Sequence, residues 1–377
     1  GKEKDIYLTR GAWAEDNTHF TYQIQSRNQQ TLALWAYHVE TAQQRTLITD
    51  TADTWVNLHK ALRFLDDKRH FVWASERDGF KHLYLYHLQH GLVRQLTKGH
   101  WVVTSLDAVD EFNQWVYFSG RKDSAIENHV YRVPLSGGEI GVSQRDGFHS
   151  VKFSDNASIY VDNFSTVNTP PQVSVHQASG KQLTWLAENA LNAEHPLAPY
   201  QADWVQPEFG TLTTKDNAEL HYRLYKPKMI KGKHPVIVYV YGGPGVQVVT
   251  NKWAGQRGLL MQHWVNKGYV VFSVDNRGSK YRGKAFEDPL YLKMGEIEVQ
   301  DQIESVKFLR SLPYVDPQRI GIHGHSYGGY MSIMSMFKGA DYFAAGVAGA
   351  PVTDWRLYDT HYTERYMGDP RQVDEAY

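Results

Sequence analysis

The chain has 377 residues, which is long for one ordinary domain and indicates two. The formal net charge of −1 gives no sign of the basic surface that binds nucleic acid. The absence of cysteine excludes disulfides, a catalytic thiolate and cysteine-ligated metal sites. No run of 18 apolar residues occurs, so the sequence predicts no membrane-spanning helix.

The first half, up to about residue 200, contains short alternating runs separated by turn residues and no long amphipathic helix. Four of its segments resemble one another, each with an aromatic-bearing strand, a polar turn and a second strand. Their matching aromatic residues recur roughly every 43 to 51 residues, at Tyr22, Trp73, Tyr117 and Tyr160. Several short strands per unit at such a period are typical of β-propeller blades. We therefore predict about four blades, with an irregular β-sandwich as the alternative.

Prolines cluster between residues 189 and 208 and indicate a linker, so we predict domains at 1–200 and 201–377. After the linker, apolar runs of strand length alternate with helical patterns. The predicted strands are 235–241, 269–274 and 344–348, and the predicted helices are 253–267 and a segment with Val299, Ile303, Val306 and Leu309 on one face. This alternation predicts a doubly wound, mostly parallel sheet.

The stretch Gly324-His325-Ser326-Tyr327-Gly328 follows the predicted strand 319–323 and precedes the predicted helix 330–337. A serine flanked by glycines at a sharp strand-to-helix turn is typical of a nucleophile elbow. We predict that Ser326 is a nucleophile and that the backbone N–H of Tyr327 stabilises an oxyanion. The alternative is a serine in an ordinary glycine-rich turn.

Four stretches resemble the prolyl oligopeptidase class (S9) of serine peptidases and, within it, the dipeptidyl peptidase IV family of bacterial type. They are Val240–Gly245, Val274–Ser279, His325–Tyr330 and Tyr362–Gly368. The resemblance implies the last blades of a partial β-propeller followed by the first part of an α/β-hydrolase domain. It also implies a serine exopeptidase that releases Xaa-Pro or Xaa-Ala dipeptides from peptide N-termini through an acyl-enzyme.

The same scaffold would also suit three alternative functions. They are a prolyl tripeptidyl peptidase, an acylaminoacyl peptidase, and a catalytically degenerate binding protein. An esterase or lipase shares the elbow, but a propeller favours the selection of peptides by size.

The resemblance assigns further site residues. The phenol of Tyr241 is the second oxyanion donor, and Arg277 braces the site. Aromatic and apolar side chains form the S1 subsite that accepts proline, namely Tyr327, Val352, Trp355, Tyr358 and Tyr362. A compact apolar ring such as proline suits flat hydrophobic walls.

The family also needs a histidine, an acid and a pair of adjacent glutamates that binds the substrate's amino terminus. The candidates after Ser326 are Asp354, Asp359, His361 and Asp369, none in the expected strand–turn setting, and no Glu-Glu pair occurs. We therefore expect the histidine and acid beyond residue 377 and the glutamates upstream, so that the sequence is a fragment without peptidase activity of its own.

No P-loop, His-Glu-x-x-His or dinucleotide motif occurs, so we expect no metal and no organic cofactor. The resemblance implies peptide substrates, no nucleic-acid partner and a homodimer of the full-length protein. It implies a periplasmic, cell-surface or secreted location, and a cytoplasmic one stays open.

Overall fold

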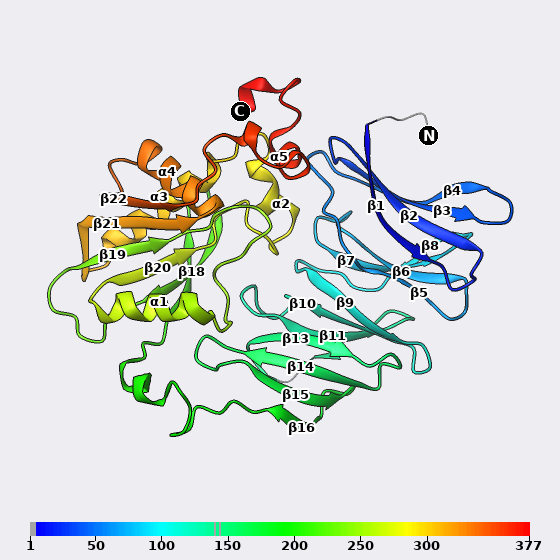
Figure 1. Ribbon diagram of the computed structural model, residues 1–377, viewed down its shortest axis with the longest axis horizontal. Coiled ribbons are helices and arrows are strands. Elements are labelled where there is room, and N and C mark those ends of the chain that lie inside the picture. Colours follow the sequence, from blue (N-terminus) through cyan, green and yellow to red (C-terminus); the bar gives the residue numbers. More distant parts are fainter. Residues whose placement is uncertain (1–4, 139–140, 143–144) are drawn as a thin grey trace.

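The part of the chain that the structure describes forms four small sheets and one larger sheet flanked by helices. The computed structural model describes residues 5–138, 141–142 and 145–377. In Figure 1 the small sheets follow one another in chain order from upper right to lower centre, and the larger sheet lies on the left. This arrangement confirms the predicted fold class, a partial β-propeller joined to a partial α/β-hydrolase domain.

Each small sheet has four antiparallel strands whose order in the sheet is their order in the chain. The first sheet holds β1 (Ile6–Trp13), β2 (His19–Ser26), β3 (Thr31–His38) and β4 (Gln44–Thr51). The second holds β5 (Leu62–Phe64), β6 (His70–Ser75), β7 (His82–His87) and β8 (Gly91–Gln95). The third holds β9 (Val103–Asp110), β10 (Trp115–Gly120), β11 (His129–Pro134) and β12 (Gly141–Val142). The fourth holds β13 (Phe148–Phe153), β14 (Ile159–Ser165), β15 (Gln172–Gln177) and β16 (Gln182–Ala187).

Neighbouring small sheets pack face to face through apolar side chains. Leu32 and Leu34 of β3 are buried in one cluster with Phe71 and Trp73 of β6. A second cluster joins the second and third sheets, with Phe118 of β10 at 0% exposure. Removing such side chains from water stabilises the stack by about 1.5 to 3 kcal/mol each.

The larger sheet has six strands in the order β17-β18-β20-β19-β21-β22. Its strands are β17 (Glu208–Thr213), β18 (Glu219–Tyr225), β19 (His234–Tyr239), β20 (Val270–Val274), β21 (Val315–His325) and β22 (Ala345–Gly349). The β17–β18 hairpin is antiparallel, β18 pairs antiparallel with β20, and the pairs from β20 to β22 are parallel. The sheet is therefore mostly parallel, as predicted.

Helices cover both faces of the larger sheet. The α-helices are α1 (Gly255–Asn266), α2 (Lys284–Glu287), α3 (Ile297–Ser311), α4 (Tyr327–Lys338) and α5 (Thr360–Met367). The described residues also contain four short 3-10 helices, η1 (Ala198–Asp203), η2 (Asp288–Leu290), η3 (Trp355–Leu357) and η4 (Asp374–Ala376). Val271 packs with α1, whereas its neighbours Val270 and Phe272 pack with α3 and α4. Successive residues of a strand point to opposite faces, so α1 covers one face and α3 with α4 the other.

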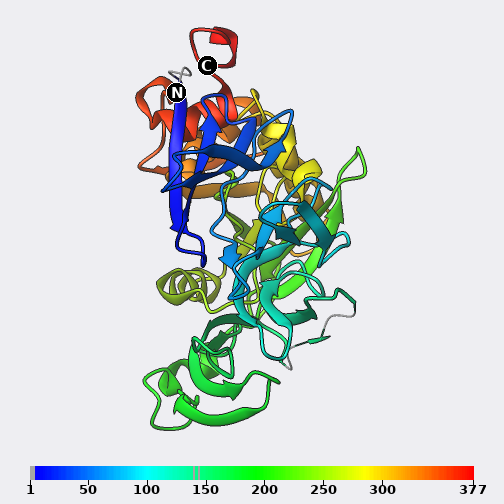
Figure 2. The same cartoon turned by 90° about the vertical axis from the view of Figure 1, so that its right-hand side faces the viewer.

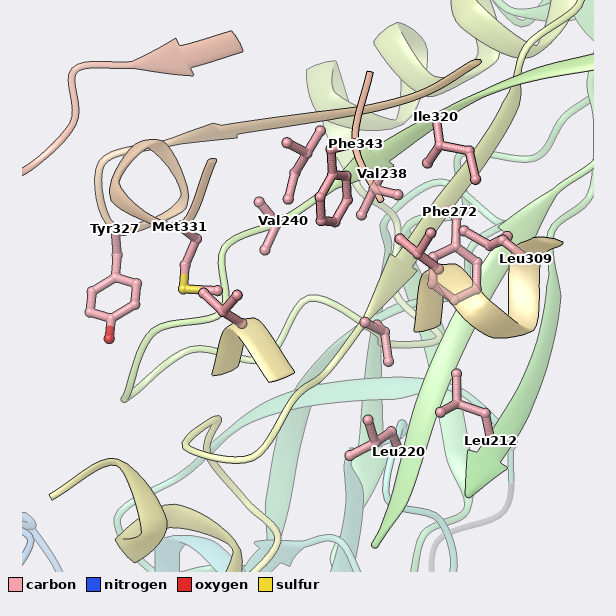
Figure 3. Packing of buried hydrophobic residues seen from close by; sticks show 14 of the residues in the cluster. Leu212, Leu220, Val238, Val240, Phe272, Leu309, Ile320, Tyr327, Met331 and Phe343 are labelled. Carbon is pink, nitrogen blue, oxygen red and sulfur yellow. The ribbon is translucent and has the colours of Figure 1, made fainter. Parts of the chain in front are cut away.

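The core under α3 and α4 supports the end of β21 (Figure 3). Val238, Phe272 and Ile320 of three parallel strands are at 0% exposure, and so are Leu309 of α3 and Met331 of α4. Well-packed cores move little, so this cluster fixes the position of the turn between β21 and α4.

Ion pairs and hydrogen bonds connect the small sheets to the hydrolase domain. The Arg27 guanidinium donates to both carboxylate oxygens of Glu364 on α5, at 2.8 and 2.7 Å. Lys284 Nζ donates to the carbonyl of Trp55 at 2.9 Å and lies 3.8 Å from the centre of its ring. Figures 1 and 2 both show α5 beside the first small sheet.

The segment between β16 and β17 contains η1 and no strand. We propose that the boundary between the two domains lies in this segment, near residue 200. Within the described residues, no helix is both long enough and apolar enough to cross a membrane.

Candidate active site

Ser326 lies at the turn from β21 into α4, at the carboxyl edge of the parallel strands. Its backbone has φ 60° and ψ −118°, a left-handed conformation that is strained for a serine. Such a conformation costs about 1 to 3 kcal/mol and persists where the surroundings hold it, most often at functional sites. Here the Ser326 N–H donates to the carbonyl of Gly349 on β22 at 2.9 Å.

Glycines let the elbow approach the end of β19. A Cβ on Gly328 would lie 2.3 Å from the carbonyl oxygen of Val240, and one on Gly324 would lie 2.4 Å from the same atom. Both distances are far below van der Waals contact, so only glycine permits this packing. The sequence pattern therefore has the structural context that a nucleophile elbow requires.

The two residues predicted to supply the oxyanion donors have neighbouring aromatic rings. The N–H of Tyr327 opens α4, where the first backbone N–H groups have no partner within the helix. Tyr241 follows β19, and its ring centre lies 5.9 Å from that of Tyr327. Burial raises the pKa of the Tyr241 phenol, so the hydroxyl keeps its proton and can donate a hydrogen bond.

The predicted S1 residues form one aromatic cluster. Trp355 of η3 lies 5.5 Å from Tyr327, 5.8 Å from Tyr358 and 6.1 Å from Tyr362 between ring centres, and is stacked on the last. Val352 packs against the core that contains Tyr327 and Trp355. Tyr358 is 47% exposed, so the cluster has a solvent-facing end.

The four acid and histidine candidates have other partners. Asp354 and Asp369 each form an ion pair with the arginine two residues further along the chain. Asp359 accepts a hydrogen bond from the backbone at the start of α5. His361 Nε2 lies 3.1 Å from the side-chain oxygen of Gln25 in the first small sheet. Each of these contacts accounts for its residue without a role in catalysis.

Arg277 is held by two carboxylates. Its guanidinium donates to Asp216 Oδ2 at 2.6 Å and to Asp301 Oδ1 at 2.7 Å. Its backbone N–H also donates to Asp301 Oδ2 at 2.8 Å. These contacts tie the loop after β20 to α3 and to the turn between β17 and β18, and the role of Arg277 in bracing the site stays a prediction.

Sequence reasoning missed Glu298, which contacts the elbow directly. Tyr327 Oη donates to Glu298 Oε1 at 2.5 Å, and Glu298 is at 0% exposure. Burial raises the pKa of the Glu298 carboxyl to about 7. No motif marks this residue, because a glutamate in the first turn of a helix is usual at exposed positions.

Comparison with known proteins follows the two halves of the chain. Residues 1–171 match the model for the dipeptidyl peptidase IV (DPP IV) N-terminal region, and residues 257–377 match the prolyl oligopeptidase family. Human dipeptidyl peptidase 8 is 34% identical over 370 residues, covering 87% of this chain and 41% of the relative. Dipeptidyl peptidase 4 of Trichophyton tonsurans is 29% identical, covering 97% of this chain and 48% of the relative.

The solved structure of Porphyromonas gingivalis dipeptidyl peptidase 4 superposes with a TM-score of 0.92 at 32% sequence identity. The match covers 100% of this chain and 53% of that structure. The chain thus spans about half the length of the relatives that it matches.

Proposed function

Because this chain belongs to the dipeptidyl peptidase IV branch of the prolyl oligopeptidase family, we propose that the whole protein is a serine exopeptidase. It releases Xaa-Pro or Xaa-Ala dipeptides from the N-termini of peptides. The observation that carries the proposal is the strained Ser326 at the elbow, whose flanking glycines pack against the backbone of Val240, the residue before Tyr241.

In this proposal Ser326 Oγ attacks the carbonyl carbon of the second substrate residue. Negative charge then develops on the carbonyl oxygen. The N–H of Tyr327 and the phenol of Tyr241 donate hydrogen bonds to it. One such donor contributes about 3 kcal/mol of transition-state stabilisation in serine hydrolases. Collapse of this intermediate breaks the peptide bond, and the leaving amine takes up the proton that Ser326 gave to its general base. The dipeptide remains as an ester on Ser326, which water hydrolyses.

Ser326 needs a histidine as general base and an acidic residue that orients this histidine. The structure gives other contacts to the candidates for the general base and the acid, so we propose none of them for these roles. The candidates are Asp354, Asp359, His361 and Asp369. We propose that the rest of the protein supplies the histidine and the acid, as well as the glutamates that bind the substrate's amino terminus.

The aromatic cluster supports the preference for proline. Proline is compact, apolar and without an N–H, so it gains from flat ring faces and loses no hydrogen bond there. Trp355 and Tyr362 are stacked at 6.1 Å and present such faces beside the elbow. Alanine is small enough to enter the same subsite with less contact.

Product analysis of the full-length protein tests the proposal. A peptide that begins Ala-Pro is incubated with the protein, and the released fragment is identified by mass spectrometry. The N-acetylated peptide serves as the control. Release of the dipeptide from the free peptide alone is expected. Release of a tripeptide or of an acetylated residue would support the other activities on this scaffold, and no release would support a binding protein.

The partners and location are also proposed from the family. We expect the full-length protein to form a homodimer, which light scattering after size-exclusion chromatography tests. A periplasmic, cell-surface or secreted location is supported by the similarity to bacterial dipeptidyl peptidase 4. Fractionation of the source cells tests that location.

A further inference from the structure

Helix α3 carries a row of polar side chains that face the protein interior. Glu298, Asp301, Gln302 and Ser305 are all at 0% exposure. Their spacing places them on one face of the helix. A buried polar group without a hydrogen-bond partner costs about 1 to 3 kcal/mol, so the hydrogen bonds that these side chains make matter for the packing of this face.

The first contact of this face holds the elbow. Both carboxylate oxygens of Glu298 accept from the N–H of Gly295 at 3.0 Å, which fixes the carboxylate at the start of α3. One of them also accepts from the phenol of Tyr327 at 2.5 Å. Tyr327 is 2% exposed, and a Cβ on Gly243 would lie 2.4 Å from its ring. The elbow tyrosine is therefore clamped between α3 and the turn that follows Tyr241.

The second contact holds that turn. Gln302 Nε2 donates to Asn276 Oδ1 at 2.9 Å. Asn276 Nδ2 in turn donates to the carbonyl of Gly242 at 2.8 Å and to that of Arg277 at 2.7 Å. Gly242 has φ 74°, and a Cβ there would lie 3.0 Å from Asn276 Oδ1. Because Gly242 directly follows Tyr241, this chain of hydrogen bonds restrains the backbone turn beside the residue whose phenol is the second donor.

We propose that α3 sets the distance between the two oxyanion donors, with Glu298 and Gln302 as positioning residues. The two side chains are four residues apart, about one helical turn, on a single rigid element. Glu298 holds the tyrosine whose N–H is one donor, and Gln302 holds the turn that carries the other. This inference rests on the proposed serine peptidase function and adds the residues that orient its oxyanion site.

Two variants of the full-length protein test the inference. Gln302→Met keeps the length of the side chain but cannot donate to Asn276. Glu298→Leu removes the acceptor of the Tyr327 phenol. Ser305→Ala is the matched control, since Ser305 is equally buried and its hydroxyl donates to the carbonyl of Gln302 in its own helix, at 2.7 Å. The readout is the rate at which a fluorophosphonate labels the protein, with kcat and KM for an Ala-Pro chromogenic substrate measured in parallel.

A misplacement of about 1 Å at a catalytic group costs roughly 10²-fold in rate. We expect Gln302→Met and Glu298→Leu to label 10- to 100-fold more slowly and Ser305→Ala within twofold of wild type. For Gln302→Met, kcat should fall while KM stays within about threefold, because the side chain of Gln302 donates to Asn276, which is not one of the predicted S1 residues. A purely structural role would instead lower thermal stability without this split.

Labelling of both variants at the wild-type rate would overturn the inference. If a variant does not fold, Glu298→Gln decides the case for the first contact. Its amide oxygen can still accept from the phenol, so labelling within fivefold of wild type is expected, and a loss as large as that of Glu298→Leu would contradict the role of this contact. Wild-type protein that is labelled but releases no dipeptide would refute the proposed function and leave the positioning test valid. Wild-type protein that is not labelled would overturn both.

Discussion

Replacing Gly328 with alanine should separate the nucleophile elbow from the segment after β19 that carries Tyr241. The added Cβ would lie 2.3 Å from the carbonyl oxygen of Val240 and 3.2 Å from the Cα of Tyr241, both backbone atoms. To restore ordinary contact, the end of β19 must move by roughly 1 Å. A shift of that size at an oxyanion donor costs on the order of 10²-fold in rate, or about 2.7 kcal/mol.

Stability should fall as well. Overpacking of a well-packed site costs about 1 to 3 kcal/mol. Alanine is the better helix former by about 1 kcal/mol, which offsets part of that cost at this first turn of α4. We therefore expect a modest loss of stability together with a large loss of reactivity.

The assay is fluorophosphonate labelling of full-length Gly328→Ala, with thermal unfolding measured on the same sample. Gly321→Ala is the matched control on β21, where the nearest atom to the added Cβ is the carbonyl oxygen of Ala345 at 3.5 Å, an ordinary contact. The control should label like wild type. If Gly328→Ala also labelled at the wild-type rate and unfolded at the same temperature, the close approach of elbow and strand would be refuted.

Three further changes test other parts of the account. Arg27→Ala leaves the buried Glu364 carboxylate without its bidentate partner, so calorimetry should show a loss of about 1 to 3 kcal/mol, and unchanged unfolding would contradict the contact. Burial raises the pKa of Glu298 from 4.5 to about 7, so its contribution to stability is complete below pH 4.5 and is lost as the pH rises through 7. Between pH 4.5 and 9 the wild type should therefore lose about 3 kcal/mol more than Glu298→Gln in denaturant unfolding, and parallel profiles would refute this. Tyr362→Ala removes the ring stacked on Trp355, so the ratio of kcat/KM for Xaa-Pro over Xaa-Ala substrates should fall about tenfold, and an unchanged ratio would argue against this S1 subsite.

The repeat pattern of the first half could be predicted because the best-buried strands carry it. Tyr22, Trp73, Tyr117 and Tyr160 all lie on the second strand of their sheets. In each repeat the sequence pattern located two of the strands, whereas each sheet has four. Outer strands such as β8 and β16 are mostly exposed and have little apolar periodicity, so only tertiary pairing identifies them.

The elbow could be predicted because the strain and close packing there require glycines at fixed positions around Ser326. The burial of the polar face of α3 could not be predicted from the sequence. The apolar residues Val299, Val306 and Leu309 are buried as predicted, but Glu298 and Gln302 have the spacing expected of a solvent-facing side. They are buried because loops from β19 and β20 and the elbow itself cover that side, which the sequence of the helix alone does not show.

Identification of the residue labelled by a fluorophosphonate in the full-length protein tests the central claim most directly. The account predicts a single modification, found by mass spectrometry on the peptide that contains Ser326 and absent in Ser326→Ala. Labelling that persists in Ser326→Ala, or that falls on another serine, would contradict it.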